Sequence, residues 1–285
     1  MTKSISHAAV SREAQIGRDV RIGPYCVVEP EVVIGDRCIL ESRATIKRGT
    51  TLGADNHIHD GAILGGLPQH LRRPPKVGRL VIGCHNTIRE NATLNRGLRE
   101  GQCTTVGDHN LIMTGVHIAH DCHVGHHTIF ANNVMLAGHV TVEDRAYLSG
   151  AVGAHQFCRI GRHAMVGGQA HLVKDVPPFV TLDGATSRVV GLNLIGLRRH
   201  GFSDLDIQSL KAAYRIVFRS ALPWSEILER LAREFPEGPA AELHHFLLGG
   251  TRGFVHERRA GPQVTLKLRD ADAEVEEMLR WKKAG

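Results

Sequence analysis

Aromatic side chains are scarce in this sequence, and they are unevenly distributed. Phe, Trp and Tyr make up 5% of the 285 residues, and most of them lie after residue 180. A globular core commonly uses aromatic rings as bulky filler. Another feature must therefore set the packing of residues 1–180.

Several other absences restrict the class of protein. No apolar run approaches eighteen residues, so we expect no membrane-spanning helix. The start, MTKSISHAAVSREAQIG, lacks the apolar core of a secretion signal, and six Cys are too few for a disulfide scaffold of this length. Hydrophobic residues make up 42%, which excludes disorder as the main state. We expect a folded, cytoplasmic protein that binds no nucleic acid.

The sequence has instead a period of six. Every sixth residue from Val10 to Leu64 is aliphatic, and the pattern returns at residues 82–94 and 106–172. The position two residues earlier is small or narrow, and the next position is often Gly. Alternation in a strand places the large and the small residue on one face. This period predicts a parallel β-helix with three hexads, or eighteen residues, in each triangular coil.

The small inward positions hold most of the cysteines and a set of asparagines. Cys26, Cys38, Cys122 and Cys158 occupy them, and we interpret these thiols as core filler rather than metal ligands. The same slot holds Asn56, Asn86 and Asn110, whose amides are expected to hydrogen-bond along the coils.

The pattern also predicts the domain organisation. Pro, Gly and charged residues mark external loops at 65–79 and 95–103, and the period ends after Pro177-Pro178. Helical stripes follow from Ser203, where Ser203 and Asp206 resemble a capping box, from Pro223, and over residues 238–250. We predict a mainly β protein: a β-helix over 1–180, a helical domain over 181–260, and a polar tail over 261–285 with a candidate helix at 272–283.

The densest group of the nineteen histidines is TGVHIAHDCHVGHH, residues 114–127. Steps of eighteen from Asp121 lead to His139 and then to Phe157 beside His155, so these residues stack at about 4.8 Å spacing. We expect His117, His120 and Asp121 to point outward and to line a surface cleft. The column suits a solvated ridge, a zinc site of three histidines as in hexapeptide-repeat carbonic anhydrases, or a histidine base oriented by a carboxylate. A non-catalytic β-helix used for assembly or binding is a further alternative.

Four segments carry a resemblance to a known family. HIAHDCHVG, LAGHV, AHQFCRIG and GLNLIGLRRHGF resemble the UDP-N-acetylglucosamine acyltransferases, over roughly residues 5–255. The resemblance implies left-handed coils and a homotrimer with sites between subunits. It also implies transfer of a 3-hydroxyacyl chain from acyl carrier protein to the sugar 3-hydroxyl, the first step of lipid A synthesis. No cofactor or metal is implied.

The resemblance further implies roles for single residues. His120 is the general base, Asp121 orients it, and Gly138 offers a backbone N–H to the oxyanion. The residues implied to line the substrate sites are His117, His139 and His155 for sugar and pantetheine, Asn193 and Arg199 for donor and nucleotide, and Gly168 for acyl length. We expect Gln69, His70 and Arg72 to reach the site from a neighbouring subunit.

This chain departs from the family's usual residues at four positions. His70 and Arg72 stand where Asp and Lys are usual, Asn95 replaces a common His, and Ile195 replaces a common acidic residue. A related UDP-sugar with a 3-amino group therefore remains an alternative acceptor. Because acyl carrier proteins are acidic, we also expect Lys211, Arg215 and Arg219, with Arg198 and Arg199, to steer the carrier.

Overall fold

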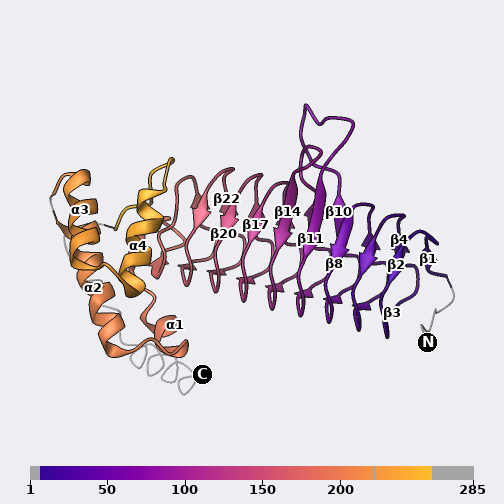
Figure 1. Cartoon of the computed structure of the whole chain (residues 1–285), viewed down its shortest axis with the longest axis horizontal. Helices are drawn as coiled ribbons and strands as arrows, with labels where there is room; N and C mark the ends of the chain where they lie inside the picture. Colours follow the sequence, from indigo (N-terminus) through magenta and orange to yellow (C-terminus); the bar gives the residue numbers. More distant parts are fainter. Residues whose placement is uncertain (1–6, 221, 259–285) are drawn as a thin grey trace, which may run out of the picture.

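The computed structural model describes residues 7–220 and 222–258. The chain forms a long three-sided prism of short strands, with four helices gathered at its C-terminal end (Figure 1). The polar tail over 261–285, and the helix expected at 272–283, lie outside the described residues. Among the described helices, none combines the length and the apolar character that crossing a bilayer requires.

Each side of the prism is one sheet, and the parallel strands that neighbour each other in it come from successive coils. Face 1 contains β1 (Ala9–Val10), β4 (Val27–Val28), β7 (Thr45–Ile46), β10 (Ile63–Gly66), β13 (Thr93–Asn95), β16 (His117–Ile118), β19 (Met135–Leu136), β22 (Gly153–Ala154) and β25 (His171–Leu172). Face 2 contains β2 (Gln15–Ile16), β5 (Val33–Ile34), β8 (Thr50–Leu52), β11 (Arg79–Ile82), β14 (Cys103–Val106), β17 (His123–Val124), β20 (Thr141–Val142) and β23 (Arg159–Ile160). Face 3 contains β3 (Arg21–Ile22), β6 (Ile39–Leu40), β9 (His57–Ile58), β12 (Thr87–Ile88), β15 (Leu111–Ile112), β18 (Ile129–Phe130), β21 (Tyr147–Leu148), β24 (Met165–Val166), β26 (Val180–Leu182) and the antiparallel β27 (Val189–Leu192).

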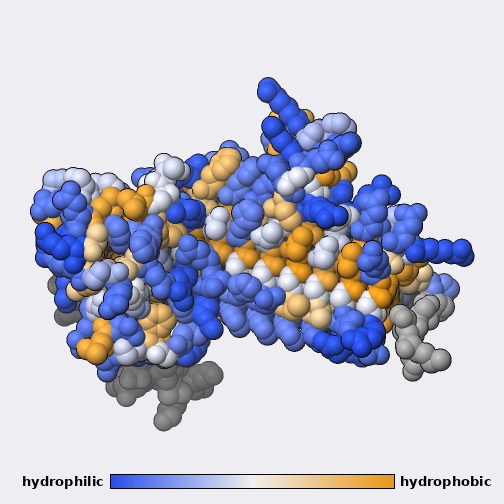
Figure 2. Space-filling view, in the orientation of Figure 1, coloured by the Kyte–Doolittle hydropathy of each residue, from blue (hydrophilic) through white to orange (hydrophobic). Residues whose placement is uncertain are grey.

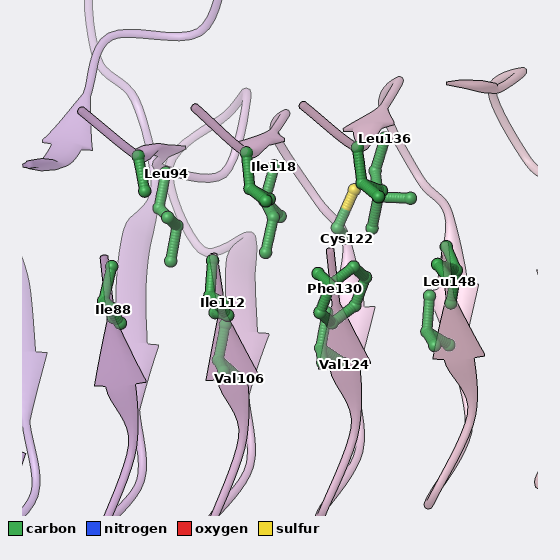
Figure 3. Close-up of a cluster of buried hydrophobic side chains, with 14 of the residues drawn as sticks. Ile88, Leu94, Val106, Ile112, Ile118, Cys122, Val124, Phe130, Leu136 and Leu148 are labelled. Atoms are coloured by element: carbon green, nitrogen blue, oxygen red, sulfur yellow. The ribbon is translucent and has the colours of Figure 1, made fainter. Parts of the chain in front are cut away.

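The aliphatic residues that recur every six positions are the inward-facing residues of these strands. Ile112 pairs with Phe130, and Phe130 pairs with Leu148, so residues eighteen apart lie in register on adjacent coils. Their side chains meet inside the prism, where each is fully buried (Figure 3). Val10 departs from the pattern because it lies on β1 at the end of the prism, where it is 40% exposed.

The small inward positions behave as predicted. Cys26, Cys38, Cys122 and Cys158 are fully buried, and burial raises the pKa of the Cys122 thiol to about 12. In the asparagine ladder, the Asn86 Nδ2 donates to Asn56 Oδ1 at 3.0 Å, and the Asn110 N–H donates to Asn86 Oδ1 at 2.9 Å. These bonds run along the coils as predicted, and the Asn110 Nδ2 is the one ladder amide nitrogen that finds no partner within the described residues.

The chain turns at the three edges of the prism through residues with positive φ. Asp121, His139 and Phe157 have φ of 59°, 61° and 67°, and they lie on the edge between faces 1 and 2. L residues adopt this backbone at a cost, which the packed coils on both sides offset. One column of side chains therefore follows each edge.

Two connections project from this regular body. Residues 67–78 join β10 to β11 and residues 96–102 join β13 to β14, at the positions where the sequence predicts external loops. The longer connection stands out from the prism as a separate lobe (Figure 1). The Gly78 N–H donates to Gly97 O at 2.8 Å, so the two loops are tied together at their base.

The helical part begins after β27. It contains α1 (Leu194–Arg199), α2 (Asp204–Arg219), α3 (Trp224–Glu234) and α4 (Gly238–Leu248). Helix α2 has the predicted capping box, with the Asp206 N–H donating to Ser203 Oγ at 3.1 Å and the Ser203 N–H to Asp206 Oδ2 at 2.9 Å. Helix α3 follows Pro223 and α4 ends before Gly249, as the turn residues predict. Helix α1 was not predicted, because six residues are too few to show a helical stripe.

Candidate active site

The histidine column follows the edge between faces 1 and 2. The His139 ring stacks on Phe157 with centroids 4.6 Å apart, and its Nε2 lies 3.7 Å from Asp121 Oδ2. His155 is exposed beside Phe157, and its Nδ1 lies 3.3 Å from an Arg252 guanidinium nitrogen. The predicted stacking of Asp121, His139 and the Phe157 region is therefore present.

His120 and Asp121 form a tight pair on this edge. The His120 Nδ1 lies 2.8 Å from Asp121 Oδ2. The Leu98 backbone N–H donates to both Asp121 carboxylate oxygens, at 3.2 and 3.1 Å, and the Asp121 N–H donates to Thr104 Oγ1 at 2.8 Å. A carboxylate held in this way keeps the proton of a neutral imidazole on Nδ1 and leaves the Nε2 lone pair free to accept a proton.

The expectation that His120 and Asp121 lie open on the surface is wrong. Their exposed fractions are only 8% and 5%, because both loops fold over this edge. Leu98 covers the carboxylate, and the His70 ring lies edge-on to His120 with centroids 5.8 Å apart. The hexad pattern predicts the coil positions but does not show where an inserted loop returns to the prism.

His70 also lies in a different place from the one expected for the loop at 65–79. We expected Gln69, His70 and Arg72 to approach the site of a neighbouring subunit, but His70 lies against His120 of its own chain. The Arg72 N–H donates to His70 Nδ1 at 3.0 Å, which fixes the orientation of this imidazole. Gln69 and Arg72 are exposed on the same loop.

Gly138 lies directly beside the His120 ring. A Cβ at this position would be 2.6 Å from His120 Cε1 and 2.8 Å from Nε2, so no larger residue fits without moving the imidazole. Gly138 is buried, and its N–H donates to no group among the described residues. A buried N–H without a partner is costly in a native structure and is available to a developing oxyanion.

Burial disfavours the charged form of the neighbouring imidazoles. His117 projects from the outer side of β16, half-buried, with its Nδ1 2.8 Å from Thr93 Oγ1. Burial lowers the pKa of His117, and burial is also the main cause that lowers the pKa of His139. Neutral imidazoles can donate and accept hydrogen bonds to an uncharged sugar.

Three of the predicted site residues lie elsewhere in the same chain. Gly168 lies on the edge between faces 3 and 1, next to Gly150. Asn193 caps α1 by accepting from the Gly196 N–H, and its Nδ2 donates to the carbonyl of His163 on the edge between faces 2 and 3. Arg199 is exposed at the end of α1. Together with the histidine column between faces 1 and 2, the predicted site residues of one chain are therefore distributed over all three edges.

The zinc alternative predicts three histidine ligands converging on one point. In the described part of the chain, the one group with metal-site geometry is His120, Asp121 and His139, with ligand atoms within 4.8 Å of one another. It offers two imidazoles and a carboxylate, and the Nδ1 of His120 already bonds to Asp121. The residues do not form the three-histidine set.

Two contributors to this site were not found from the sequence. Leu98 acts through its backbone N–H, for which its side chain gives no signal. Thr104 acts through a hydroxyl at a small inward position of β14, which resembles ordinary core filler in the pattern.

Known proteins match both parts of the chain. The family model for bacterial transferase hexapeptide repeats matches residues 13–48 and 103–138, and the model for domain 2 of UDP-N-acetylglucosamine O-acyltransferase matches residues 175–255. The acyl-[acyl-carrier-protein]–UDP-N-acetylglucosamine O-acyltransferase of Herminiimonas arsenicoxydans is 40% identical over 256 residues, which cover 88% of this chain and 98% of that protein. This chain belongs to the UDP-N-acetylglucosamine O-acyltransferase family.

Solved structures of the family have the same fold. The Francisella novicida UDP-N-acetylglucosamine acyltransferase has a TM-score of 0.86 at 35% identity, covering 90% of this chain and 94% of that one. The Acinetobacter baumannii structure has a TM-score of 0.85 at 40% identity, covering 88% of this chain and 99% of that one. The prism is accordingly a left-handed parallel β-helix with a C-terminal helical domain. The exact domain boundaries at residues 180 and 260 stay predictions.

Proposed function

We propose that this chain transfers a 3-hydroxyacyl group from acyl carrier protein to the 3-hydroxyl of UDP-N-acetylglucosamine, the first step of lipid A biosynthesis, in the cytoplasm. The observation that carries the proposal is the buried pair of His120 and Asp121. Beside the imidazole lies Gly138, whose N–H has no hydrogen-bond partner in the part of the chain that the structure describes. A base beside an oxyanion donor suits acyl transfer.

In the proposed reaction, the His120 Nε2 removes the proton of the sugar 3-hydroxyl as that oxygen attacks the thioester carbon. The Gly138 N–H stabilises the negative charge that develops on the carbonyl oxygen. The tetrahedral intermediate then collapses, the carbon–sulfur bond breaks, and the imidazolium returns its proton to the departing thiolate. Asp121 stabilises the imidazolium while it exists and keeps the ring oriented.

The remaining predicted residues would bind the two substrates around this centre. His117 lies on β16 of the same coil as His120, and His139 and His155 lie on the next two coils, so the three suit the sugar and the pantetheine arm. The acceptor sugar would be bound by Gln69, His70 and Arg72. The donor and the nucleotide would be bound by Asn193 and Arg199, and the far end of the acyl chain would lie at Gly168.

The proposal includes a homotrimer with shared sites. His120 and Gly168 lie on different edges of one prism, so a second copy is the simplest way to place them opposite each other. Thr45, Ile63, His117 and Met135 are outward residues of face 1, and none of them carries a fixed charge. An apolar to weakly polar band runs along the prism between hydrophilic borders (Figure 2). Three flat faces of this kind are buried by closed threefold symmetry.

The proposal is tested by His120→Ala in an acyl-transfer assay with 3-hydroxyacyl carrier protein and UDP-N-acetylglucosamine. We expect turnover to fall by about 10²–10⁴-fold, because one proton-transfer group is lost. Asp121→Asn should cost less, since Asp121 orients the base and does not react. Near-normal turnover of His120→Ala, in protein with an unchanged circular dichroism spectrum, would remove His120 from the mechanism.

A second acceptor is favoured by one specific observation. His70 stands where the resemblance implies Asp, its ring centroid lies 5.8 Å from that of His120, and it lacks the negative charge of a carboxylate. A UDP-sugar with a 3-amino group is therefore the alternative acceptor. Competition between the two UDP-sugars for one acyl carrier protein distinguishes them, and His70→Asp should shift the ratio towards the 3-hydroxyl sugar if His70 sets the choice.

A further inference from the structure

A cavity of about 430 Å³ lies where the last coils of the prism meet the helices. Its walls come from β23, from the segment after β25, and from α2, α3 and α4 with the residues that follow α4. His120, Asp121 and Gly138 do not line it. Cavities at a junction of this kind are a common location of ligand sites.

The inner walls of the cavity are apolar. Val217, Ile227, Phe246 and Leu247 line it, and each of them is at most 7% exposed. At the rim, the Trp224 and Phe254 rings lie 5.1 Å apart, and Trp224 remains 41% exposed. An apolar chain that entered here would displace water from a preformed surface and gain free energy roughly in proportion to the area buried.

The charge of the lining residues is positive. Asp175 is the one carboxylate among them, and Arg159 neutralises it through an Nε to Oδ2 contact of 2.8 Å. The same guanidinium donates to Phe246 O at 2.7 Å and lies 4.1 Å from the centroid of the Phe246 ring, so its donors and its charge are largely used. Lys174 is exposed and makes no ion pair within the described residues.

We propose that this cavity binds a single-chain amphiphile with an anionic head group, such as a fatty acid of medium length. The apolar chain occupies the space between Trp224, Ile227 and Phe246, and the head group contacts Lys174 at the rim. A cationic amphiphile is disfavoured because the cavity offers it no free carboxylate. The inference goes beyond acyl transfer, because the site needs neither the carrier protein nor the sugar nucleotide.

Trp224 provides a local reporter of binding. Trp281 is the only other tryptophan of the sequence, so the full-length Trp281→Phe variant leaves Trp224 as the single source of tryptophan fluorescence. Dodecanoate with bromine near its methyl end, added below its micelle concentration and without other substrates, should quench this fluorescence saturably. Lys174→Glu should weaken the apparent affinity about tenfold, because one attractive charge is replaced by a repulsive one. Lys76→Glu, on the distant loop 67–78, is the matched control and should leave the affinity unchanged.

Competition against brominated dodecanoate shows which head groups the cavity binds. Dodecyl phosphate should compete about as well as dodecanoate, whereas dodecanol and dodecyltrimethylammonium should compete at least about tenfold less well. A preference between carboxylate and phosphate would then tell a free fatty acid from a phosphorylated lipid. Quenching that does not saturate, equal affinity in Lys174→Glu, or equal competition by dodecanol would overturn the proposal. The acyl-transfer assay is separate, so failure here leaves the proposed function standing.

Discussion

His120 is held by groups from four different segments. Asp121 follows it in the chain, Leu98 and His70 come from the two loops, and Gly138 comes from the next coil. No short segment could therefore position this imidazole alone. Its orientation depends on the register of the coils and on the way in which both loops return to the prism.

Gly138→Ala tests this close contact at the scale of one residue. The new Cβ would overlap the His120 ring at 2.6–3.1 Å, so the imidazole must move away from its position beside Asp121. We expect kcat/KM to fall by about 10²-fold, since a displacement near 1 Å at a catalytic group costs about that much. Steady-state acyl-transfer kinetics measure this loss.

The matched control is Gly150→Ala, at the equivalent turn position on a different edge. Its Cβ would meet nothing closer than Asn132 O at 3.6 Å. Gly150→Ala should retain nearly full activity, and both variants should keep the thermal midpoint within a few degrees. Equal activities of the two variants would contradict the proposed contact.

The burial of His163 leads us to expect that the free energy of unfolding depends on pH. It is 2% exposed and lies between the Phe179 and Phe202 rings, and burial, followed by the Arg162 charge, lowers its pKa to about 4. The unfolded chain takes up a proton near pH 6.5, whereas the folded chain does not until about pH 4. The contribution is therefore fully present above pH 6.5 and is lost as the pH falls through this window.

Lowering the pKa of His163 from 6.5 to about 4 corresponds to about 3 kcal/mol of unfolding free energy. Urea unfolding at several pH values from 7 to 4 should show this loss in the natural chain, and His163→Gln should show a flatter dependence. The same slope in both proteins would mean that another group titrates.

At the scale of elements, the sequence predicts the regular parts well and the inserted parts poorly. The aliphatic period places the inward positions of the strands, because each coil repeats one geometry and residues eighteen apart pair directly. The edge column of Asp121, His139 and Phe157 follows from the same arithmetic. The burial of His120 does not, because it depends on loops whose conformation no repeat encodes. Helix α1 was not found because its six residues are stabilised by Asn193 and by packing, not by a periodic pattern.

Helix α2 carries the basic residues that we expect to steer the carrier protein. Arg219 is already paired with Glu257 at 2.8 Å, whereas Lys211 and Arg215 are exposed and have no ion pair among the described residues. Within α2 we therefore restrict the prediction to these two residues, while the exposed Arg198 and Arg199 of α1 stay part of it. The double variant Lys211→Glu and Arg215→Glu should raise KM for acyl carrier protein about tenfold at low salt, and less at high salt, with kcat nearly unchanged.

The salt dependence of KM for acyl carrier protein distinguishes a loss of electrostatic steering from damage to the fold. Arg219→Glu should lower stability as well, since it breaks the contact with Glu257. If KM for the carrier in the double variant stays at the natural value across salt concentrations, then this surface is merely solvated.

At the scale of the whole molecule, the distribution of residues over the edges of the prism predicts complementation between subunits. Because His70 and His120 lie together in one chain, a loop deletion and His120→Ala would damage the same half of a shared site. His120→Ala and Gly168→Trp damage different edges. Random co-assembly of equal amounts of these two inactive chains should recover about a quarter of all sites, or about one site in each mixed trimer, where an intact His120 edge meets an intact Gly168 edge.

The recovered turnover is measured in co-expressed chains with different tags, after native mass spectrometry has shown that the trimers are mixed. Homogeneous trimers of each variant provide the baseline. An absence of recovery in trimers shown to be mixed would place each complete site within one chain.

The most direct test of the account compares the natural chain with His120→Ala in one acyl-transfer assay, with a 3-hydroxyacyl carrier protein as donor and UDP-N-acetylglucosamine as acceptor. We expect the natural chain to form a 3-O-acylated UDP-sugar, identified by mass spectrometry, and His120→Ala to form it about 10²–10⁴-fold more slowly. No product from the natural chain with either UDP-sugar, or equal rates from both proteins, would contradict it.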